Sequence, residues 1–187
     1  EAVAHLTAEA MSGEIDFATS LKQRVALLAG QPESLLQNVY NLAITLSPGA
    51  RTLTSTLRAH GAYTALVSSN FRFFTERVAA EAGFDDVTGN HLVITDGKLT
   101  GAIDGAVQGA EAKRTKLLEL TNLHGLRPID VLAAGDGAND IPMLQVAGMG
   151  VAFHGKPRVR EAVRLRLDHV GLIGLLYLQG YRRDHFV

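Results

Sequence analysis

The stretch AAGDGANDIPM, residues 133–143, decides how this chain is interpreted. It ends an apolar run at Gly135, places Asp136 and Asp140 four residues apart, and fills the gap with small and polar residues. In open parallel sheets, ligands bind beyond the carboxyl ends of strands, where a carboxylate and a helix start can meet a cation and an anion together. A helix cap alone needs no glycine on both sides. We therefore interpret this loop as a binding site.

The composition limits the classes of partner. The 187 residues are 47% hydrophobic and 20% charged, which is typical of a globular domain with a smaller attachment. The net charge of -1 lacks the attraction that nucleic acid or an anionic membrane needs, so neither is expected as a partner. The absence of cysteine excludes disulfides and thiolate chemistry and favours a reducing, cytoplasmic compartment. The apolar stretch at residues 170–178 is too short to span a membrane.

Helical patterns fill the first quarter of the chain. Apolar residues recur at helical spacing after Asp16, a good N-cap, and Gly30 ends this pattern. Pro32 opens a second helical pattern over residues 32–42. Helices joined so tightly predict a small bundle, which we assign as a cap over residues 1–46.

From residue 47 onward, helices alternate with strands. Helices are predicted at residues 47–61, 71–83, 111–124 and 172–179, and strands at 63–68, 129–134 and 148–153. Asp96 and Gly97 centre a hairpin at residues 91–103. Alternation of this kind predicts an α/β core over residues 47–187, with a mostly parallel sheet covered by helices on both faces.

Two further residues are candidates for the same site as Asp136. Ser68 ends the strand at residues 63–68, so its hydroxyl and the amides after it could hold a phosphate in the same crevice. Lys113 stands at the front of an amphipathic helix. Alone, Ser68 would be interpreted as a turn residue and Lys113 as a solvated surface charge. Only their combination with Asp136 favours a binding site.

These pieces, in this order, resemble the phosphoserine phosphatase family of the haloacid dehalogenase superfamily. GDGANDIPM, residues 135–143, matches the family's last motif, and the resemblance extends through MSGEIDF, SLKQRVALLAG, the LTG hairpin and GVAFHGKP over nearly the entire chain. It implies a haloacid dehalogenase-like, Rossmann-type three-layer core with a mostly parallel sheet, and a small helical-bundle cap. The implied reaction is magnesium-dependent hydrolysis of O-phospho-L-serine through an aspartyl-phosphate.

The resemblance also implies roles for particular residues. Asp136 would bind Mg²⁺, while Ser68, Ser69 and the following amides would bind the phosphoryl oxygens. Lys113 would stabilise the charge on phosphate, with Asp140 orienting it. The remaining implied substrate contacts are Asn139 beside the substrate, Arg24 on its carboxylate, and Met11 and Phe17 shielding the site.

The sequence departs from the family in its nucleophile. The family's Asp-x-Asp-x-Thr motif on the first core strand is absent, and no two aspartates here are separated by one residue. That strand is central in the family's sheet, so we expect two unpaired strand edges. We expect residues 1–187 alone to be poorly stable or inactive, and the motif to be encoded upstream.

A second departure concerns Ser69 and Asn70, which stand where the family usually has two glycines. Glycine accepts positive φ angles and lets the backbone approach phosphate, so Ser69→Gly should improve turnover if the serine side chain obstructs phosphate. The alternatives are a phosphatase or phosphotransferase for another small phosphomonoester, a catalytically dead protein that binds a phosphorylated metabolite, and a scaffold that forms a homodimer without binding magnesium at Asp136.

Overall fold

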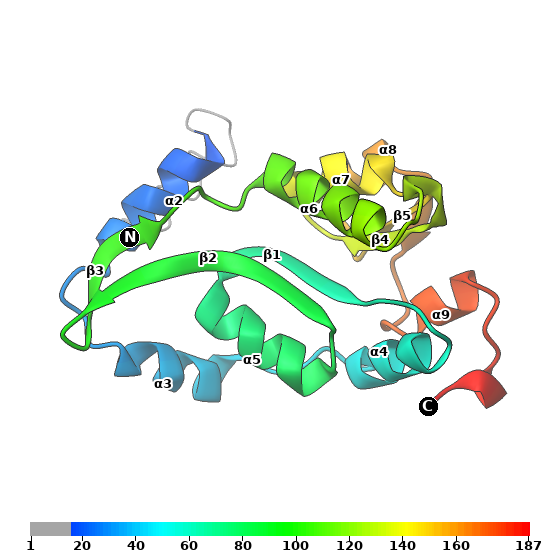
Figure 1. Cartoon of the computed structure of the whole chain (residues 1–187), viewed down its shortest axis with the longest axis horizontal. Coiled ribbons are helices and arrows are strands. Elements are labelled where there is room, and N and C mark those ends of the chain that lie inside the picture. The colour runs from blue at the N-terminus through cyan, green and yellow to red at the C-terminus, as the bar shows by residue number, and fades with distance from the viewer. Residues whose placement is uncertain (1–15) are drawn as a thin grey trace. The chain divides into compact units, whose positions relative to one another are not determined.

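The computed structural model describes residues 16–187 and has an α/β fold, as the sequence predicts. One three-stranded sheet has the order β1-β2-β3, formed by β1 (Ala65–Phe71), β2 (Asp86–Thr95) and β3 (Lys98–Asp104). The other has the order β4-β5-β6, formed by β4 (Leu132–Gly135), β5 (Met149–Phe153) and β6 (Leu165–Leu167) (Figure 1). Within the described residues, β1 and β4 each pair with a single neighbour. The same holds for β3 and β6, so the expectation that a missing first core strand leaves two edges unpaired stays a prediction.

Contacts divide the chain into two compact units. The first contains the described residues up to Thr45 together with Ser68–Arg77 and Thr88–Gly109, and the second contains Leu46–Val67, Val78–Val87 and Ala110–Val187. The chain thus passes between the units several times. The division into a cap over residues 1–46 and a core over residues 47–187 differs in extent from these units and stays a prediction.

The sheet of the second unit is parallel throughout. Leu132 pairs with Met149 and Gly135 with Ala152, while Val151 pairs with Leu165. Val151 and Ala152 are fully buried, because side chains on both faces of β5 are covered by helices. Burial of both faces is the usual condition of a parallel sheet.

Two separate apolar clusters cover the faces of this sheet. On one face, α6 (Ala110–Leu123), α7 (Ile141–Val146) and α8 (Pro157–Ala162) contribute to a cluster of Leu117, Ala133, Met143, Leu144, Ala152 and Val159. On the other, α4 (Ala50–Ala59) and α9 (Gly174–Leu178) contribute to a cluster of Leu53, Val151, Leu175 and Leu176. Figure 1 shows α6 and α7 lying beside each other near β4 and β5. The sheet is therefore the middle of three layers.

The first unit is built on a hairpin. Strands β2 and β3 are antiparallel, and Asp96 and Gly97 between them have φ angles of 49° and 70°, the left-handed values that a tight hairpin turn requires. Helix α2 (Phe17–Ala26) begins at Asp16, whose Oδ1 accepts hydrogen bonds from the amides of Ala18 and Thr19. This helix packs along β3. The unit thus includes a β surface that the expectation of a purely helical bundle left out.

The second helix of this unit packs on the same hairpin. Helix α3 (Ser34–Ala43) contributes Leu36 to a buried cluster with Phe74 and Leu99. Phe74 lies on α5 (Arg72–Ala82), which begins directly after β1. The apolar positions of α3 are therefore covered by α5 and β3.

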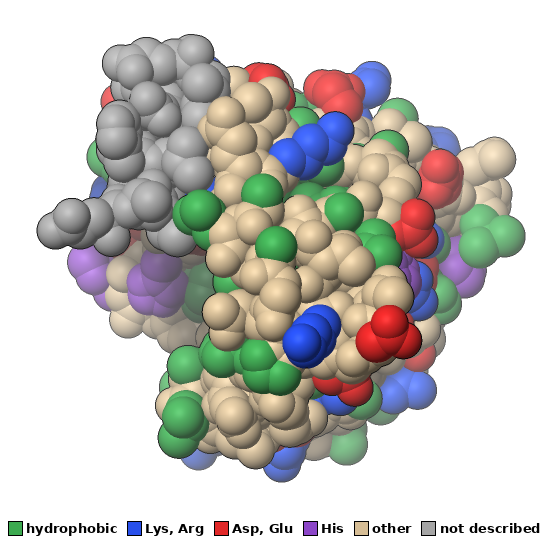
Figure 2. Space-filling model, turned by 90° about the vertical axis from the view of Figure 1, so that its left-hand side faces the viewer, with side chains coloured by type: hydrophobic (Ala, Val, Ile, Leu, Met, Phe, Trp, Pro, Cys, Tyr) green, Lys and Arg blue, Asp and Glu red, His purple; other side chains and the backbone are tan. Residues whose placement is uncertain are grey.

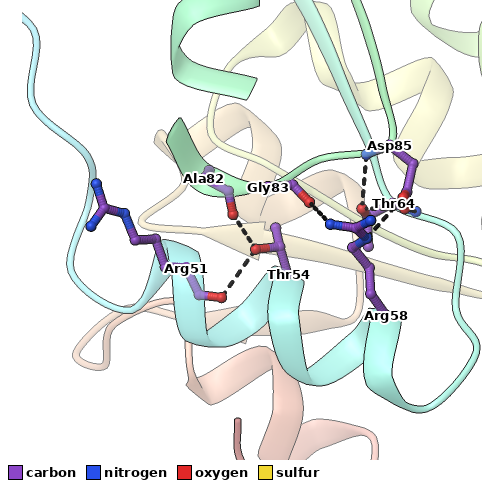
Figure 3. A network of polar contacts seen from close by, with 7 residues as sticks. All are labelled: Arg51, Thr54, Arg58, Thr64, Ala82, Gly83 and Asp85. Atoms are coloured by element: carbon purple, nitrogen blue, oxygen red, sulfur yellow. Dashed lines mark hydrogen bonds and ion pairs between the residues drawn. The ribbon is translucent and has the colours of Figure 1, made fainter. Parts of the chain in front are cut away.

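A polar network fixes the starts of β1 and β2 within the second unit (Figure 3). The amide and hydroxyl of Thr64 donate to Asp85 Oδ2 over 2.9 and 2.8 Å, and Arg58 Nε lies 2.8 Å from Asp85 Oδ1. Arg58 also donates to the carbonyl of Gly83, while Thr54 Oγ1 donates to the carbonyl of Ala82. Burial raises the pKa of Asp85, but the Thr64 hydrogen bonds and the Arg58 charge outweigh it and lower that pKa below its ordinary value.

Some boundaries differ from the sequence-based prediction. The strand expected at residues 129–134 begins only at Leu132, because Pro128–Asp130 forms a 3-10 turn in which Asp130 accepts from the Arg127 amide. Strand β1 extends to Phe71, and β6 was not predicted. Short elements carry too few residues for a clear periodicity, which explains these errors.

The surface carries charges of both signs. On the face that Figure 2 shows, Lys and Arg side chains are interspersed with Asp and Glu side chains. Among residues 16–187, no helix has the length and apolar character needed to cross a bilayer.

Candidate functional site

The loop after β4, which we call the aspartate loop (residues 135–140), is organised by the carboxylate of Asp140. Its Oδ1 lies 2.6 Å from Lys113 Nζ, and its Oδ2 accepts hydrogen bonds from the amides of Asp136 and Gly137 over 3.1 and 3.0 Å. Lys113 and Asp140 are 7% and 5% exposed. A buried ion pair is tolerated when further hydrogen bonds satisfy its oxygens, as they do here. Asp140 therefore holds both the lysine and the loop backbone.

The two glycines on either side of Asp136 stand where a larger side chain would not fit. A Cβ atom at Gly135 would lie 2.5 Å from the Cβ of Asp140, and one at Gly137 would lie 2.5 Å from Oδ1 of Asn139. Gly137 has a φ angle of -108°, which any residue can adopt. The glycines are thus required because the side chains of residues 139 and 140 fold back over them. Helix α7 follows at once, with Pro142 in its first turn as expected.

The side chain of Asp136 differs from that of Asp140. Its backbone is fixed at both ends, since its amide donates to Asp140 and its carbonyl accepts from the Lys156 amide at 3.0 Å. Its carboxylate is exposed and makes no hydrogen bond or ion pair with any residue in the range 16–187. A carboxylate held in place at a strand end, with its oxygens unused, is available to an external ligand.

This arrangement suits a hard, strongly hydrated cation. No group of three His, Cys, Asp or Glu side chains gathers as a metal site within residues 16–187. Mg²⁺ does not need such a cage, because it is usually bound by one or two carboxylates together with water and substrate phosphate. The single free carboxylate of Asp136 fits that pattern, whereas it would not by itself form a structural zinc or calcium site.

The end of β1 provides a second group of polar atoms, which we call the serine segment (residues 68–70). Oγ of Ser68 accepts a hydrogen bond from the Asn70 amide at 3.0 Å, so the hydroxyl proton of Ser68 remains able to donate elsewhere. Asn70 Oδ1 accepts from the amide of Phe71 at 2.7 Å. Outside glycine, positive φ among the described residues occurs only at Asp96 and His154. Ser69 and Asn70 therefore stand here without the backbone strain that their replacement of glycine suggested.

Sequence reasoning missed the residues that hold the serine segment. Thr88 Oγ1 accepts from the Ser68 amide at 3.3 Å, and Asn90 Nδ2 donates to the Ser69 carbonyl at 2.7 Å. Both lie on β2, where polar residues look like surface positions of an alternating strand. The available signal was that asparagine is disfavoured in strands, so its presence in a predicted strand called for a reason.

The other predicted residues fall into the same two groups. Arg24 and Phe17 lie on α2 in the first unit, as the serine segment does, and Met11 lies outside the described residues. Lys113, Asn139 and the two aspartates lie in the second unit. The structure thus brings together Lys113, Asp140 and the backbone of Asp136, while the serine segment and Arg24 are described within their own unit.

A family model and individual relatives both match most of this chain. The family model described as haloacid dehalogenase-like hydrolase matches residues 3–145. A protein of Polaromonas sp. (strain JS666 / ATCC BAA-500) named phosphoserine phosphatase is 44% identical over 181 residues, which cover 94% of this chain and 77% of that protein. A protein of the same name from Lactococcus lactis subsp. lactis is 42% identical over 174 residues, covering 93% of this chain and 80% of the relative.

The solved structures agree with the sequence relatives. A substrate-bound phosphoserine phosphatase complex superposes with a TM-score of 0.87 at 34% identity, over 95% of this chain and 84% of that one. Sequence and structure thus point to the same group of hydrolases.

Proposed function

This chain belongs to the phosphoserine phosphatase family of the haloacid dehalogenase superfamily, and we propose that it hydrolyses O-phospho-L-serine to L-serine and phosphate in the cytoplasm. The observation that carries the proposal is the buried Lys113–Asp140 pair beside the free carboxylate of Asp136. In this family the phosphoryl group passes to an aspartate and then to water. The residues described here would bind and orient the phosphate for those two steps.

Lys113 is suited to stabilise phosphoryl charge. One of its three N–H groups meets Asp140 Oδ1, which leaves two to donate to phosphoryl oxygens. Burial strengthens such contacts because the surrounding dielectric constant is lower than that of water. Asp140 orients the ammonium group, so the charge is in place before substrate arrives.

Asp136 would hold Mg²⁺, which when bound supplies positive charge that offsets the charge on the phosphoryl oxygens. The proposed role of Ser68 is to donate its free hydroxyl proton to a phosphoryl oxygen, beside the amides of the serine segment. Asn139 lies in the same loop as Asp136 and would contact the substrate. These assignments follow the family residue by residue.

The serine part of the substrate would be recognised from the first unit. Arg24 Nε donates to the carbonyl of Ser20 at 3.4 Å, which leaves its two terminal amino groups for a carboxylate. Phe17 lies beside Gly109 and, with Met11, would shield the site from water. The attacking aspartate and its neighbouring general acid belong to the motif that residues 1–187 do not contain.

The test uses the protein encoded by the complete gene. We expect magnesium-dependent release of phosphate from O-phospho-L-serine, and a loss of activity of at least about a hundredfold in Asp136→Asn, because removal of one charge-stabilising group typically costs that much. Asp130→Asn, which changes an exposed aspartate, is the matched control. Full activity in Asp136→Asn would refute the metal assignment.

Activity, ligand-binding and oligomeric-state measurements on the same protein separate the alternatives. Faster hydrolysis of another small phosphomonoester would replace phosphoserine as the substrate. Binding of inorganic phosphate without turnover by the complete protein would favour the catalytically dead binding protein. A homodimer with neither activity nor magnesium binding would favour the scaffold.

A further inference from the structure

Asn90 is a buried polar residue whose position the reaction assigned above does not explain. It lies on β2, is 1% exposed, and occupies a strand position where asparagine is disfavoured. Its Nδ2 donates to the Ser69 carbonyl at 2.7 Å and its Oδ1 accepts from the Gln108 amide at 2.7 Å. A carbonyl can only accept and an amide N–H can only donate, so these partners fix the orientation of the carboxamide.

Neighbouring residues of β2 hold the same segment. Thr88, two residues before Asn90 and therefore on the same face of the strand, accepts from the Ser68 amide. Between them, a Cβ atom at Gly89 would lie 2.7 Å from Thr75 Oγ1 and 3.0 Å from the Cα of Arg72. Strand β2 thus approaches the start of α5 closely at Gly89 and holds the serine segment through the alternate residues Thr88 and Asn90.

The planarity of the peptide bond gives this contact a chemical consequence. The Ser69 carbonyl and the Asn70 N–H belong to one rigid peptide group and point in opposite directions. The hydrogen bond from Asn90 to that carbonyl therefore also sets the direction of the Asn70 N–H. This N–H donates to Ser68 Oγ at 3.0 Å, so on the proposed function it holds the hydroxyl that donates to a phosphoryl oxygen.

We propose that Asn90 is a positioning residue for phosphate, which sets the direction of the peptide group between Ser69 and Asn70 without touching the substrate. Its Oδ1 also holds the backbone amide of Gln108, which belongs to the same unit. This inference rests on the proposed function, because it assigns the serine segment to phosphate binding. It predicts that Asn90 governs affinity for the phosphate part of the substrate and not for the serine part.

The test compares Asn90→Asp with wild type in the complete encoded protein. Aspartate keeps the size and the acceptor for Gln108, but its ionised form cannot donate to the Ser69 carbonyl. We expect KM for O-phospho-L-serine and the inhibition constant of inorganic phosphate to rise about tenfold, equivalent to about 1.4 kcal/mol. We expect kcat to change by less than about threefold and the inhibition constant of L-serine to stay constant, because on this proposal Asn90 does not touch the substrate. Amide exchange at residues 69–71 should accelerate, because the hydrogen bond is lost and a buried carboxylate faces the Ser69 carbonyl oxygen.

Two further variants keep the test decisive. Thr88→Val removes the acceptor for the Ser68 amide and should weaken phosphate inhibition in the same direction, so the proposal does not depend on one variant folding. Thr54→Val removes a buried hydroxyl in the other unit that donates to the Ala82 carbonyl. It should lower thermal stability while leaving phosphate and L-serine inhibition at wild-type values.

The outcomes separate this inference from the proposed function. If wild type hydrolyses phosphoserine and the Asn90 and Thr88 variants keep wild-type phosphate inhibition, the inference is wrong and the proposed function stands. Equal weakening of phosphate and L-serine inhibition would also overturn it, because that result describes a general structural defect. If wild type has no activity, the proposed function fails and the phosphate role of Asn90 fails with it, whatever the exchange rates show.

Discussion

The aspartate loop follows β4 and the serine segment lies in the second half of β1. The residues that hold each region differ in how far they lie from it in the sequence. In the aspartate loop, the Asp140 carboxylate binds backbone amides three and four residues earlier, and glycines leave the space it needs. In the serine segment, the carbonyl of Ser69 and the amide of Ser68 are held by Asn90 and Thr88, about twenty residues later in sequence. The first region contains most of its own support, and the second depends on the pairing of β1 with β2.

This difference explains which region could be recognised as a motif. A loop that supports itself needs the same residues at the same spacing wherever it occurs, so a short stretch of sequence identifies it. A segment supported by a neighbouring strand can keep its shape with Ser69 and Asn70 in place of two glycines, because the partner strand fixes its backbone. Four substitutions test this contrast.

The largest effect is expected from Lys113→Met. It leaves the Asp140 carboxylate buried without its counter-charge, which typically costs about 3 to 5 kcal/mol. Urea denaturation at neutral pH measures the loss in free energy of unfolding. Arg127→Ala, which breaks the exposed pair with Asp130, should cost less than about 1 kcal/mol. Equal stability of Lys113→Met and wild type would show that the aspartate loop does not depend on this pair.

Gly135→Ala should have the next largest effect. The added methyl group would lie 2.5 Å from the Cβ of Asp140, and overpacking of this kind costs about 1 to 3 kcal/mol. The control is Gly171→Ala, whose new Cβ would lie 3.4 Å from the Pro48 carbonyl oxygen, an ordinary contact. The two variants are compared by thermal unfolding. A Gly135→Ala protein as stable as the control would contradict the spatial reason given for this glycine.

The contribution of the Asp85 network to stability should depend on pH in the acid range. Because the folded-state pKa of Asp85 is lowered, its contribution to stability is present above the unfolded pKa of about 4 and is lost as pH falls through the folded pKa. Thr64→Val removes the hydroxyl that donates to the Asp85 carboxylate and accepts from the Asp85 amide, so it raises that pKa and should cost about 1 kcal/mol at neutral pH. Acid unfolding should therefore begin at higher pH.

The matched control for Thr64 is Thr121→Val. Thr121 is also buried, but its hydroxyl donates to the Leu118 carbonyl and bonds to no carboxylate among residues 16–187. Its acid transition, followed by circular dichroism, should keep the wild-type midpoint once the difference in neutral stability is subtracted. If Thr121→Val shifted the acid transition as much as Thr64→Val, the shift could not be attributed to the Thr64–Asp85 contact at the starts of β1 and β2.

The smallest effect is expected from Ser69→Gly. Glycine within a strand costs about 0.5 to 1 kcal/mol of stability through lost backbone restriction. Because Ser69 does not have a positive φ and the atom held by Asn90 is its carbonyl, we expect turnover of phosphoserine to stay within about twofold of wild type. A clear increase in kcat would show instead that the serine side chain obstructs phosphate.

Prediction from sequence succeeded where a residue's neighbours in sequence are also its neighbours in space. Asp16 caps α2, Asp96 and Gly97 form the hairpin turn, and Pro142 lies in the first turn of α7, because caps and turns are decided within a few residues. The strand starting at Leu132 was misplaced by three residues, since Asp130 bonds to Arg127 and extends the turn. The roles proposed for Arg24, Asn139 and Ser68 stay predictions.

The sequence by itself determined the α/β fold, the family and the aspartate loop, because periodic apolar residues and a self-supporting motif carry their structural consequences locally. Only the tertiary structure decided that the Asp140 carboxylate binds the loop amides as well as Lys113, and that Thr88 and Asn90 hold the serine segment. These contacts join residues about 20 or more positions apart, or depend on the direction of a side chain, and neither can be deduced from local spacing. The physical reason is that a buried polar group is stable only when all its partners are present, and the fold alone brings those partners together.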